Sequence, residues 1–174
     1  MPTHLQTRAQ LNAWEQANIS RAVTWLRGRR DRRSVLDARF LTELHRRMFD
    51  QTWRWAGHFR TTGRNLGVAP DAIAMDLTNL LADTQFWVDH HTYPVDEIAI
   101  RFHHRLVSIH PFPNGNGRHA RLATDALLES LGRARFMWGS HEPGGRIDAR
   151  SRYLRALRAA DRGDVKDLLE FARS

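Results

Sequence analysis

The 174-residue sequence contains no cysteine, which excludes disulfide bonds and thiolate metal sites. It also lacks any apolar run long enough for a transmembrane helix. The first ten residues, MPTHLQTRAQ, do not contain the apolar stretch of a signal peptide. We therefore expect a cytoplasmic protein that does not associate with a membrane.

Lysine is almost absent, since Lys166 is the only one, and nearly all of the positive charge comes from arginine. The formal net charge of +8 raises nucleic-acid binding as a hypothesis. The arginines are spread along the chain, however, and such a bias can simply reflect genomic base composition. The one dense run, RGRRDRR at residues 27–33, could contact a polyanion or form a solvated helix end, and we favour the helix end. Nucleic acid is therefore not the expected partner.

Apolar residues make up 41% of the chain and include six tryptophans, which argues against disorder. The length favours one compact domain. Apolar side chains recur at helical spacing in several segments, and Thr7 with Gln10 forms a capping box that opens the first of them. The sequence therefore predicts a mainly α fold, with helices at about residues 7–28, 37–49, 71–89, 94–109, 117–131, 147–160 and 165–172.

One segment interrupts the helical pattern. HFRTTGRNLGVAP, residues 58–70, contains two glycines and shows no helical period. Glycine-containing segments of this kind are typical of turns and short extended elements. We predict a short β-hairpin or an extended loop here.

The stretch HPFPNGNGRHAR, residues 110–121, lies between two predicted helices. Its glycines allow the backbone to approach a ligand closely, and successive amides in such a turn can form an anion nest. The helix that follows adds unpaired N–H groups and a favourable dipole. Arg118 and Arg121 share one face of its first turn, and guanidinium groups suit phosphate oxygens. The stretch therefore predicts a site for a di- or triphosphate.

His110 begins this stretch, at the end of the preceding predicted helix. Histidine titrates near neutral pH and commonly acts as a general base. Asn-Gly pairs could instead mark a simple hairpin turn, but no alternating strands flank them and a turn explains neither the histidine nor the arginines. Phe112 is expected to pack in the core and fix the loop.

This stretch resembles the core motif of the Fic/DOC family, HPFx[D/E]GNGRxxR, and departs from it only at Asn114, where the motif has an acid. The resemblance runs from about Val35 to the C-terminus and leaves residues 1–34 as an N-terminal helix that could be regulatory. WAGHFRTT resembles the start of the family's flap. Segments such as THLQTRAQLNAWEQANI are similar to sequences of the Fic subgroup called mobile mystery protein B. The resemblance implies a Fic-type helical bundle, residues 35–174, with a short β-hairpin flap, and one compact domain overall.

The resemblance also implies a protein adenylyltransferase, which transfers AMP from ATP to a Ser, Thr or Tyr hydroxyl of a target protein. In such an enzyme His110 is the general base that deprotonates the hydroxyl. The backbone amides of the glycine loop hold the α- and β-phosphates, and the arginines hold the β- and γ-phosphates. These nucleotide-binding residues are Gly115, Asn116, Gly117, Arg118 and Arg121. Tyr153 and Leu157 could wall the base pocket, although core packing is the better expectation for both.

Family members use Mg²⁺ as a cofactor, and the acid that this chain replaces with Asn114 helps to bind it. An amide oxygen can still ligate a hard cation, although it adds no negative charge. Mg²⁺ is in any case bound largely through substrate phosphates. We therefore expect a weakened metal site at Asn114. The flap, about residues 58–68, would hold the target protein by strand addition.

Gly117 helps to choose the reaction that the resemblance implies. In Doc-like relatives a lysine replaces this glycine, and the γ-phosphate is transferred instead, so Gly117 favours transfer of AMP. Two alternatives stay open: a Doc-like protein phosphotransferase, and a weakly active nucleotide-binding regulatory module.

Many Fic proteins carry an inhibitory helix whose glutamate pairs with the second arginine of the motif. The first predicted helix contains LNAWEQAN, which matches the inhibitory pattern poorly, yet Glu15 would lie close to a strongly basic site. We therefore hypothesise self-inhibition through a pairing of Glu15 with Arg121. An antitoxin partner, as in a toxin–antitoxin pair, is the other form of control that the resemblance allows.

Overall fold

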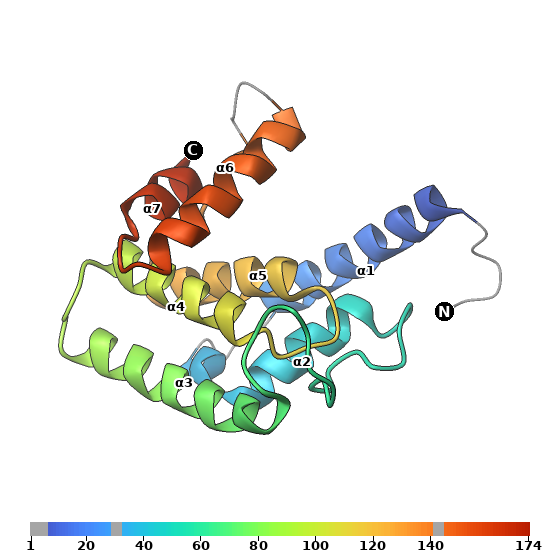
Figure 1. The fold of residues 1–174 in the computed structure, drawn as a ribbon, viewed down its shortest axis with the longest axis horizontal. Coiled ribbons are helices and arrows are strands. Elements are labelled where there is room, and N and C mark those ends of the chain that lie inside the picture. Colours follow the sequence, from blue (N-terminus) through green and yellow to red (C-terminus); the bar gives the residue numbers. More distant parts are fainter. Residues whose placement is uncertain (1–6, 29–32, 141–144) are drawn as a thin grey trace.

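The computed structural model describes residues 7–28, 33–140 and 145–174, and these residues form a mainly helical fold without a β-strand (Figure 1). Residues 29–32, at the centre of the arginine run, lie outside the described residues. The elements are α1 (Arg8–Gly28), the 3-10 helix η1 (Arg33–Leu36), α2 (Ala38–Phe49), the 3-10 helix η2 (Pro70–Ala72), α3 (Ile73–Asp89), α4 (Val95–Ile109), α5 (Asn116–Ser130), α6 (Gly145–Ala160) and α7 (Lys166–Arg173).

Side chains cap the starts of α1 and α2. The capping box before α1 is confirmed: the Thr7 amide donates to Gln10 Oε1 at 3.0 Å, and the Gln10 amide donates to Thr7 Oγ1 at 3.2 Å. Before α2, the Asp37 carboxylate accepts a hydrogen bond of 2.7 Å from the Arg39 amide. Each cap satisfies backbone N–H groups that have no partner within the helix.

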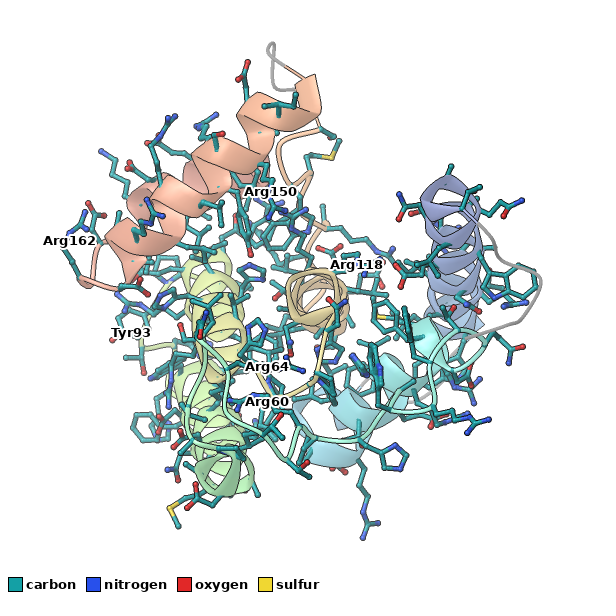
Figure 2. All side chains as sticks on the ribbon, turned by 45° about the vertical axis from the view of Figure 1, so that its right-hand side comes forward. Arg60, Arg64, Tyr93, Arg118, Arg150 and Arg162 are labelled. Atoms are coloured by element: carbon teal, nitrogen blue, oxygen red, sulfur yellow. The ribbon has the colours of Figure 1, made fainter. Side chains whose placement is uncertain are left out.

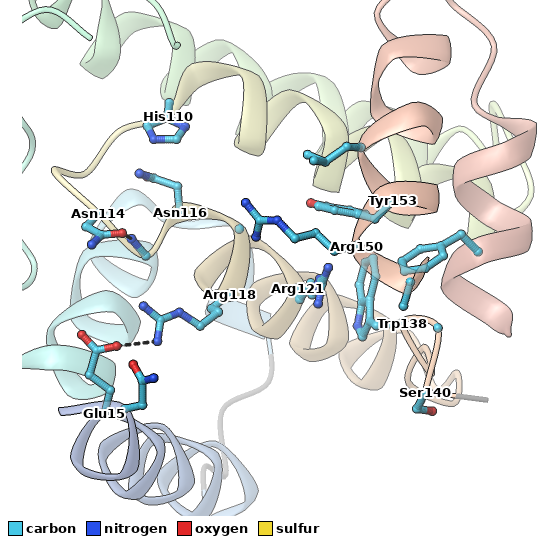
Figure 3. A pocket seen from close by; sticks show the side chains of 17 residues that line it. Glu15, His110, Asn114, Asn116, Arg118, Arg121, Trp138, Ser140, Arg150 and Tyr153 are labelled. Atoms are coloured by element: carbon cyan, nitrogen blue, oxygen red, sulfur yellow. Dashed lines mark hydrogen bonds and ion pairs between the residues drawn. The ribbon is translucent and has the colours of Figure 1, made fainter. Parts of the chain in front are cut away.

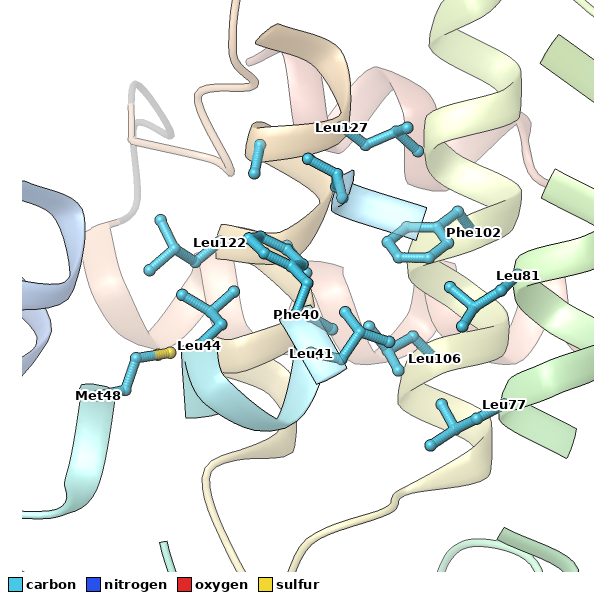
Figure 4. Packing of buried hydrophobic residues seen from close by; sticks show 14 of the residues in the cluster. Phe40, Leu41, Leu44, Met48, Leu77, Leu81, Phe102, Leu106, Leu122 and Leu127 are labelled. Atoms are coloured by element: carbon cyan, nitrogen blue, oxygen red, sulfur yellow. The ribbon is translucent and has the colours of Figure 1, made fainter. Parts of the chain in front are cut away.

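The larger hydrophobic core lies among α2, α3, α4 and α5 (Figure 4). Leu41 and Leu44 of α2 and Phe102 of α4 are fully buried there. The C-terminal half of α1 joins this core through Ala22 and Leu26. Helix α1 is therefore packed into the same unit as the helices that carry the 110–121 stretch.

A second core joins α6 and α7 to the central pair α4 and α5. Its fully buried members include Ile100, Leu128 and Phe171, and Tyr153 lies at its margin. Figure 1 shows α6 and α7 on one side of α5 and α1 on the other. The start of α5 is thus flanked by helices that come from the two ends of the chain.

The β-hairpin predicted at residues 58–68 is not confirmed, because this segment is an irregular loop without a strand. Its backbone hydrogen bonds go to the neighbouring loop instead of across a hairpin. The Arg60 amide donates to the Pro111 carbonyl at 2.9 Å, and the Val68 amide donates to the Ile109 carbonyl at 3.3 Å.

The buried side chain of Arg60, 3% exposed, explains this conformation. Its Nε donates to the His110 carbonyl at 2.7 Å, and its Nη2 donates to the carbonyls of Val68 and Ile109. One guanidinium group thus satisfies carbonyls of both loops and fixes them to each other, which a hairpin closed on itself would not require.

Within the described part of the chain, no helix combines the length and apolarity needed to cross a membrane.

Candidate active site

His110 caps the C-terminus of α4 in a left-handed backbone conformation, with φ 53° and ψ 57°. Non-glycine residues seldom adopt this conformation, and surrounding contacts must hold it. Arg60 binds its carbonyl oxygen, and Gly67 packs against its side chain so closely that a Cβ on Gly67 would lie 2.7 Å from the His110 Cβ. The imidazole is therefore held at a defined place beside the 58–68 loop.

The pKa of His110 is lowered from its ordinary value of 6.5, mainly because the ring is partly buried and also because Arg60 and Arg64 lie nearby. Both effects disfavour the imidazolium form. His110 is thus neutral at physiological pH, which is the state that a general base needs.

The glycine loop that follows is shaped by two close contacts. Gly115 has φ +80°, and a Cβ there would meet the Phe49 ring at 2.6 Å, so only glycine fits. The Asn116 side chain accepts a hydrogen bond from the Phe112 amide at 2.9 Å and donates one to the Phe112 carbonyl at 2.8 Å. The side chain of Asn116 therefore holds the loop, while its amide stays in the first turn of α5, where helix N–H groups lack a helical partner.

His45 of α2 holds the same loop by a hydrogen bond to its backbone. Its Nδ1 accepts a hydrogen bond of 2.9 Å from the Gly57 amide, so its Nε2 carries the proton and donates to the Asn114 carbonyl at 3.1 Å. The ring stacks on Phe112 with centroids 3.6 Å apart. Burial lowers the pKa of His45 to about 3, so this neutral form persists over the physiological range. Phe112 is fully buried, as predicted.

Arg118 points away from α5 towards α1, where its Nη1 lies 2.8 Å from the Glu15 carboxylate (Figure 3). The other carboxylate oxygen of Glu15 accepts a hydrogen bond of 2.7 Å from Trp53 Nε1. The predicted pairing of Glu15 with Arg121 is therefore wrong. The approach of α1 to α2 brings Glu15 next to Arg118 instead.

Arg121 stacks on two aromatic rings, those of Tyr153 and Trp138. Its guanidinium carbon is 4.5 Å from the Tyr153 ring centroid and 5.6 Å from that of Trp138, distances typical of cation–π contacts. Its Nε is buried and has no hydrogen-bond partner among the described residues. Trp138 is held by a 3.0 Å hydrogen bond from its Nε1 to Asp125. Arg121 is thus positioned by stacking on these two rings.

These side chains line one cavity of about 1110 Å³ at the start of α5 (Figure 3). His110, the glycine loop, both motif arginines and residues of α6 all line it. Figure 2 looks along α5 and shows Arg118 and Arg150 on either side of it. The size and the polar groups suit a nucleotide-sized ligand. The predicted residues brought together here are His110, Asn114, Gly115, Asn116, Gly117, Arg118, Arg121 and Glu15.

Protein ligands for a metal are scarce in this cavity. The Oδ1 of Asn114 already accepts a 2.7 Å hydrogen bond from the Gly115 amide. Glu15 is the only carboxylate among the described lining residues, and it is bound to Arg118 and Trp53. The described residues contain no group of three or more His, Cys, Asp or Glu side chains suited to a metal. The residues present therefore do not fit a Mg²⁺ ion held by the protein itself.

The sequence reasoning missed three residues of this site. Arg60 lies in the predicted flap, but nothing in the sequence marks it as the group that binds the His110 carbonyl. Trp138 and Arg150 come from segments remote from the motif: a hydrogen bond to Asp125 places Trp138 at the cavity, and the second core places α6, which carries Arg150. Tyr153 both lines the cavity and packs in the core, whereas Leu157 packs against the second core.

The sequence and the fold were compared with known proteins. The model of the Fic/DOC family matches residues 35–128. The protein adenylyltransferase Fic of Drosophila grimshawi is 30% identical over 136 residues, which cover 75% of this chain and 26% of that protein. The protein adenylyltransferase fic-1 of Caenorhabditis elegans is 29% identical over 139 residues, which cover 75% of this chain and 25% of that protein. The chain thus spans about a quarter of the length of these curated relatives.

Solved structures with the same fold include Fic-1 (residues 134–508) from C. elegans. It has a TM-score of 0.74 and 23% identity, and the match covers 99% of this chain and 50% of that one. The BepC protein from Bartonella tribocorum, solved with bound AMPPNP, has a TM-score of 0.74 and 19% identity, with 97% of this chain and 87% of that chain covered. At these identities the structural likeness establishes the fold.

Proposed function

The chain belongs to the Fic/DOC family, and on that premise we propose that it is a protein adenylyltransferase, which transfers AMP from ATP to a serine, threonine or tyrosine hydroxyl of a target protein. The observation that carries the proposal is the single cavity that joins neutral His110 to the glycine loop and both motif arginines. The relatives named as protein adenylyltransferases support the same activity.

In the proposed reaction, the His110 imidazole accepts the proton of the target hydroxyl. The hydroxyl oxygen forms a bond to the α-phosphorus of ATP as the bond between that phosphorus and the bridging oxygen breaks. Pyrophosphate leaves with the bonding electrons, and AMP stays on the target. The lowered pKa of His110 supports this role, because the base is free of a proton before the reaction begins.

The phosphates are assigned to the first turn of α5. Amides of Gly115, Asn116 and Gly117 cradle the α- and β-phosphates, and Arg118 and Arg121 hold the β- and γ-phosphates. The hydrogen bonds that fix this loop support the assignment, because a preorganised cradle loses little freedom on binding. A Mg²⁺ ion would be carried by the nucleotide's own phosphates, since the protein offers it no free carboxylate.

Gly117 supports transfer of AMP over Doc-like phosphotransfer. A Cβ at Gly117 would meet nothing within 4 Å, so core packing does not demand a glycine there. The position opens into the cavity, and the absence of a side chain leaves that space for phosphate. A chain specialised for the inverted nucleotide would instead have the lysine that the family uses.

The target protein is proposed to dock along residues 58–68, next to His110. Arg60 and Gly67 hold this loop against the histidine, and the Leu66 side chain on it is 69% exposed. An exposed apolar side chain beside a catalytic base offers a contact for a target segment.

Residues 1–34 are proposed to regulate the Fic domain of residues 35–174 through Glu15. Its carboxylate occupies Arg118, a group assigned above to the phosphates. Nucleotide binding at Arg118 would require this ion pair to break. We also propose membership of the mobile mystery protein B subgroup and an antitoxin partner, which rest on the sequence resemblance alone, and a cytoplasmic location, which rests on the composition of the sequence.

The experiment that tests the activity is incubation with ATP labelled at the α-phosphate and a cell lysate. Label on protein supports adenylylation. Label transferred from γ-labelled ATP alone would instead identify a phosphotransferase, and no transfer from either would favour a nucleotide-binding module.

A further inference from the structure

A triphosphate carries more negative charge than the groups considered so far can neutralise in this cavity. Arg118 already shares its charge with Glu15, and Asn114 contributes no charge. In enzymes that act on nucleotides, bound metal ions usually neutralise part of the phosphate charge, but this cavity lacks the carboxylates that would hold one. A further cation from the protein itself would restore the balance.

Arg150 of α6 is the third arginine that lines the cavity. Figure 3 shows its side chain extended across the cavity, with the guanidinium group turned towards the start of α5. Its side chain is exposed and makes no hydrogen bond or ion pair with another described residue. Arg150 is therefore placed opposite the phosphate cradle and is available to a ligand.

We propose that Arg150 binds the phosphates of the nucleotide and supplies the positive charge that a protein-held Mg²⁺ ion would otherwise provide. The inference rests on the proposed function, since it concerns the same nucleotide. Guanidinium groups bind phosphate oxygens in a bidentate geometry and keep their charge at any physiological pH. Arg150 and Arg118 then approach the phosphates from opposite walls of the cavity.

This assignment also sets the metal dependence of binding. With Arg150 in place, ATP binds without a divalent metal. Without Arg150, tight ATP binding requires Mg²⁺, because a bound metal ion and a bound guanidinium group neutralise the same phosphate charge. Arg150 lies outside the 110–121 stretch, so this phosphate contact is additional to those assigned to the motif.

The test is calorimetric measurement of ATP affinity in EDTA and in excess Mg²⁺. Glu15→Gly serves as the parent for all variants, so that Arg118 is free in each. We expect Arg150→Ala to weaken ATP binding in EDTA by about 10- to 100-fold, the loss of one charge-assisted phosphate contact, and Arg150→Lys to weaken it less. Mg²⁺ should partly restore binding to Arg150→Ala while changing the parent little.

Two control variants sharpen the test. Arg155→Ala removes the same charge from an exposed position of α6 that does not line the cavity, and it should bind ATP like the parent. Asn114→Asp adds the missing carboxylate and should make binding depend more strongly on Mg²⁺ than it does in the parent.

Several outcomes would overturn the inference. If Arg150→Ala binds ATP in EDTA with the same affinity as the parent, Arg150 does not bind the phosphates. If the same variant also loses transfer of AMP, Arg150 acts on the target protein instead. A parent that binds ATP only with Mg²⁺ also overturns it, while the proposed function stands. A parent that binds no ATP in either buffer overturns both.

Discussion

The carboxylate of Glu15 bridges Trp53 and Arg118, with one oxygen 2.7 Å from Trp53 Nε1 and the other 2.8 Å from Arg118 Nη1. Glu15 is only 8% exposed, whereas the Arg118 side chain is 43% exposed. The indole thus holds the carboxylate in place independently of the arginine. A residue of α1 and the phosphates of a nucleotide would compete for the same guanidinium group.

Glu15→Gly is expected to raise ATP affinity and AMP transfer, because Arg118 no longer has to leave a carboxylate. A half-exposed ion pair suggests a modest increase of about two- to fivefold. Glu15→Gln is the matched variant, since it keeps the helix and the contact with Trp53 but removes the charge. Both should activate in a transfer assay; activity equal to wild type in both would contradict a braking role for Glu15.

Gly67→Ala is expected to reduce transfer by about tenfold or more, because its φ of +97° and the 2.7 Å approach to the His110 Cβ both disfavour a side chain. Gly63→Ala is the control in the same loop, since a Cβ there would meet nothing within 4 Å. The two variants should be compared in a transfer assay. Equal activities would show that the loop does not position His110.

Arg60→Met is expected to lower the free energy of unfolding by about 2–4 kcal/mol, because it leaves the buried carbonyl of Ile109 and the part-buried carbonyls of Val68 and His110 without their charged donor. Urea denaturation measures the change. Arg64→Met, on an exposed position of the same loop, should stay within about 0.5 kcal/mol of wild type. Similar losses from both variants would argue against a structural role particular to Arg60.

The transfer rate should persist to a lower pH than an ordinary histidine allows. Burial and the charges of Arg60 and Arg64 lower the pKa of His110, so at a given acidic pH a larger share of the base is neutral than in an ordinary histidine. Arg64→Met removes one of these charges and raises that pKa. The acid limb of the pH–rate profile should therefore move to higher pH, and a move to lower pH would contradict the account.

Local signals in the sequence were sufficient for the helices. The apolar stripe of α2, with Leu41 and Leu44, and the capping box at Thr7 are set by residues close together in the chain. The 110–121 stretch was likewise readable, because His110 and the two motif arginines are brought together by one helix–loop–helix unit.

Features set by contacts between distant segments were not readable. The 58–68 loop has the glycines of a hairpin, yet buried Arg60 directs its hydrogen bonds to residues 109–111. Glu15 meets Arg118 because of how α1 packs on α2, which spacing along one helix does not reveal. Arg150 reaches the cavity through the docking of α6, and no local pattern marks it.

The central claim is that His110 deprotonates a target hydroxyl for transfer of AMP, and α-labelled ATP tests it most directly. Glu15→Gly and the double variant Glu15→Gly with His110→Ala would be incubated side by side with cell lysate, and their ATP affinities measured in parallel. We predict label on protein with the single variant and none with the double variant, at nearly equal ATP affinity. Equal labelling by both variants would contradict the account.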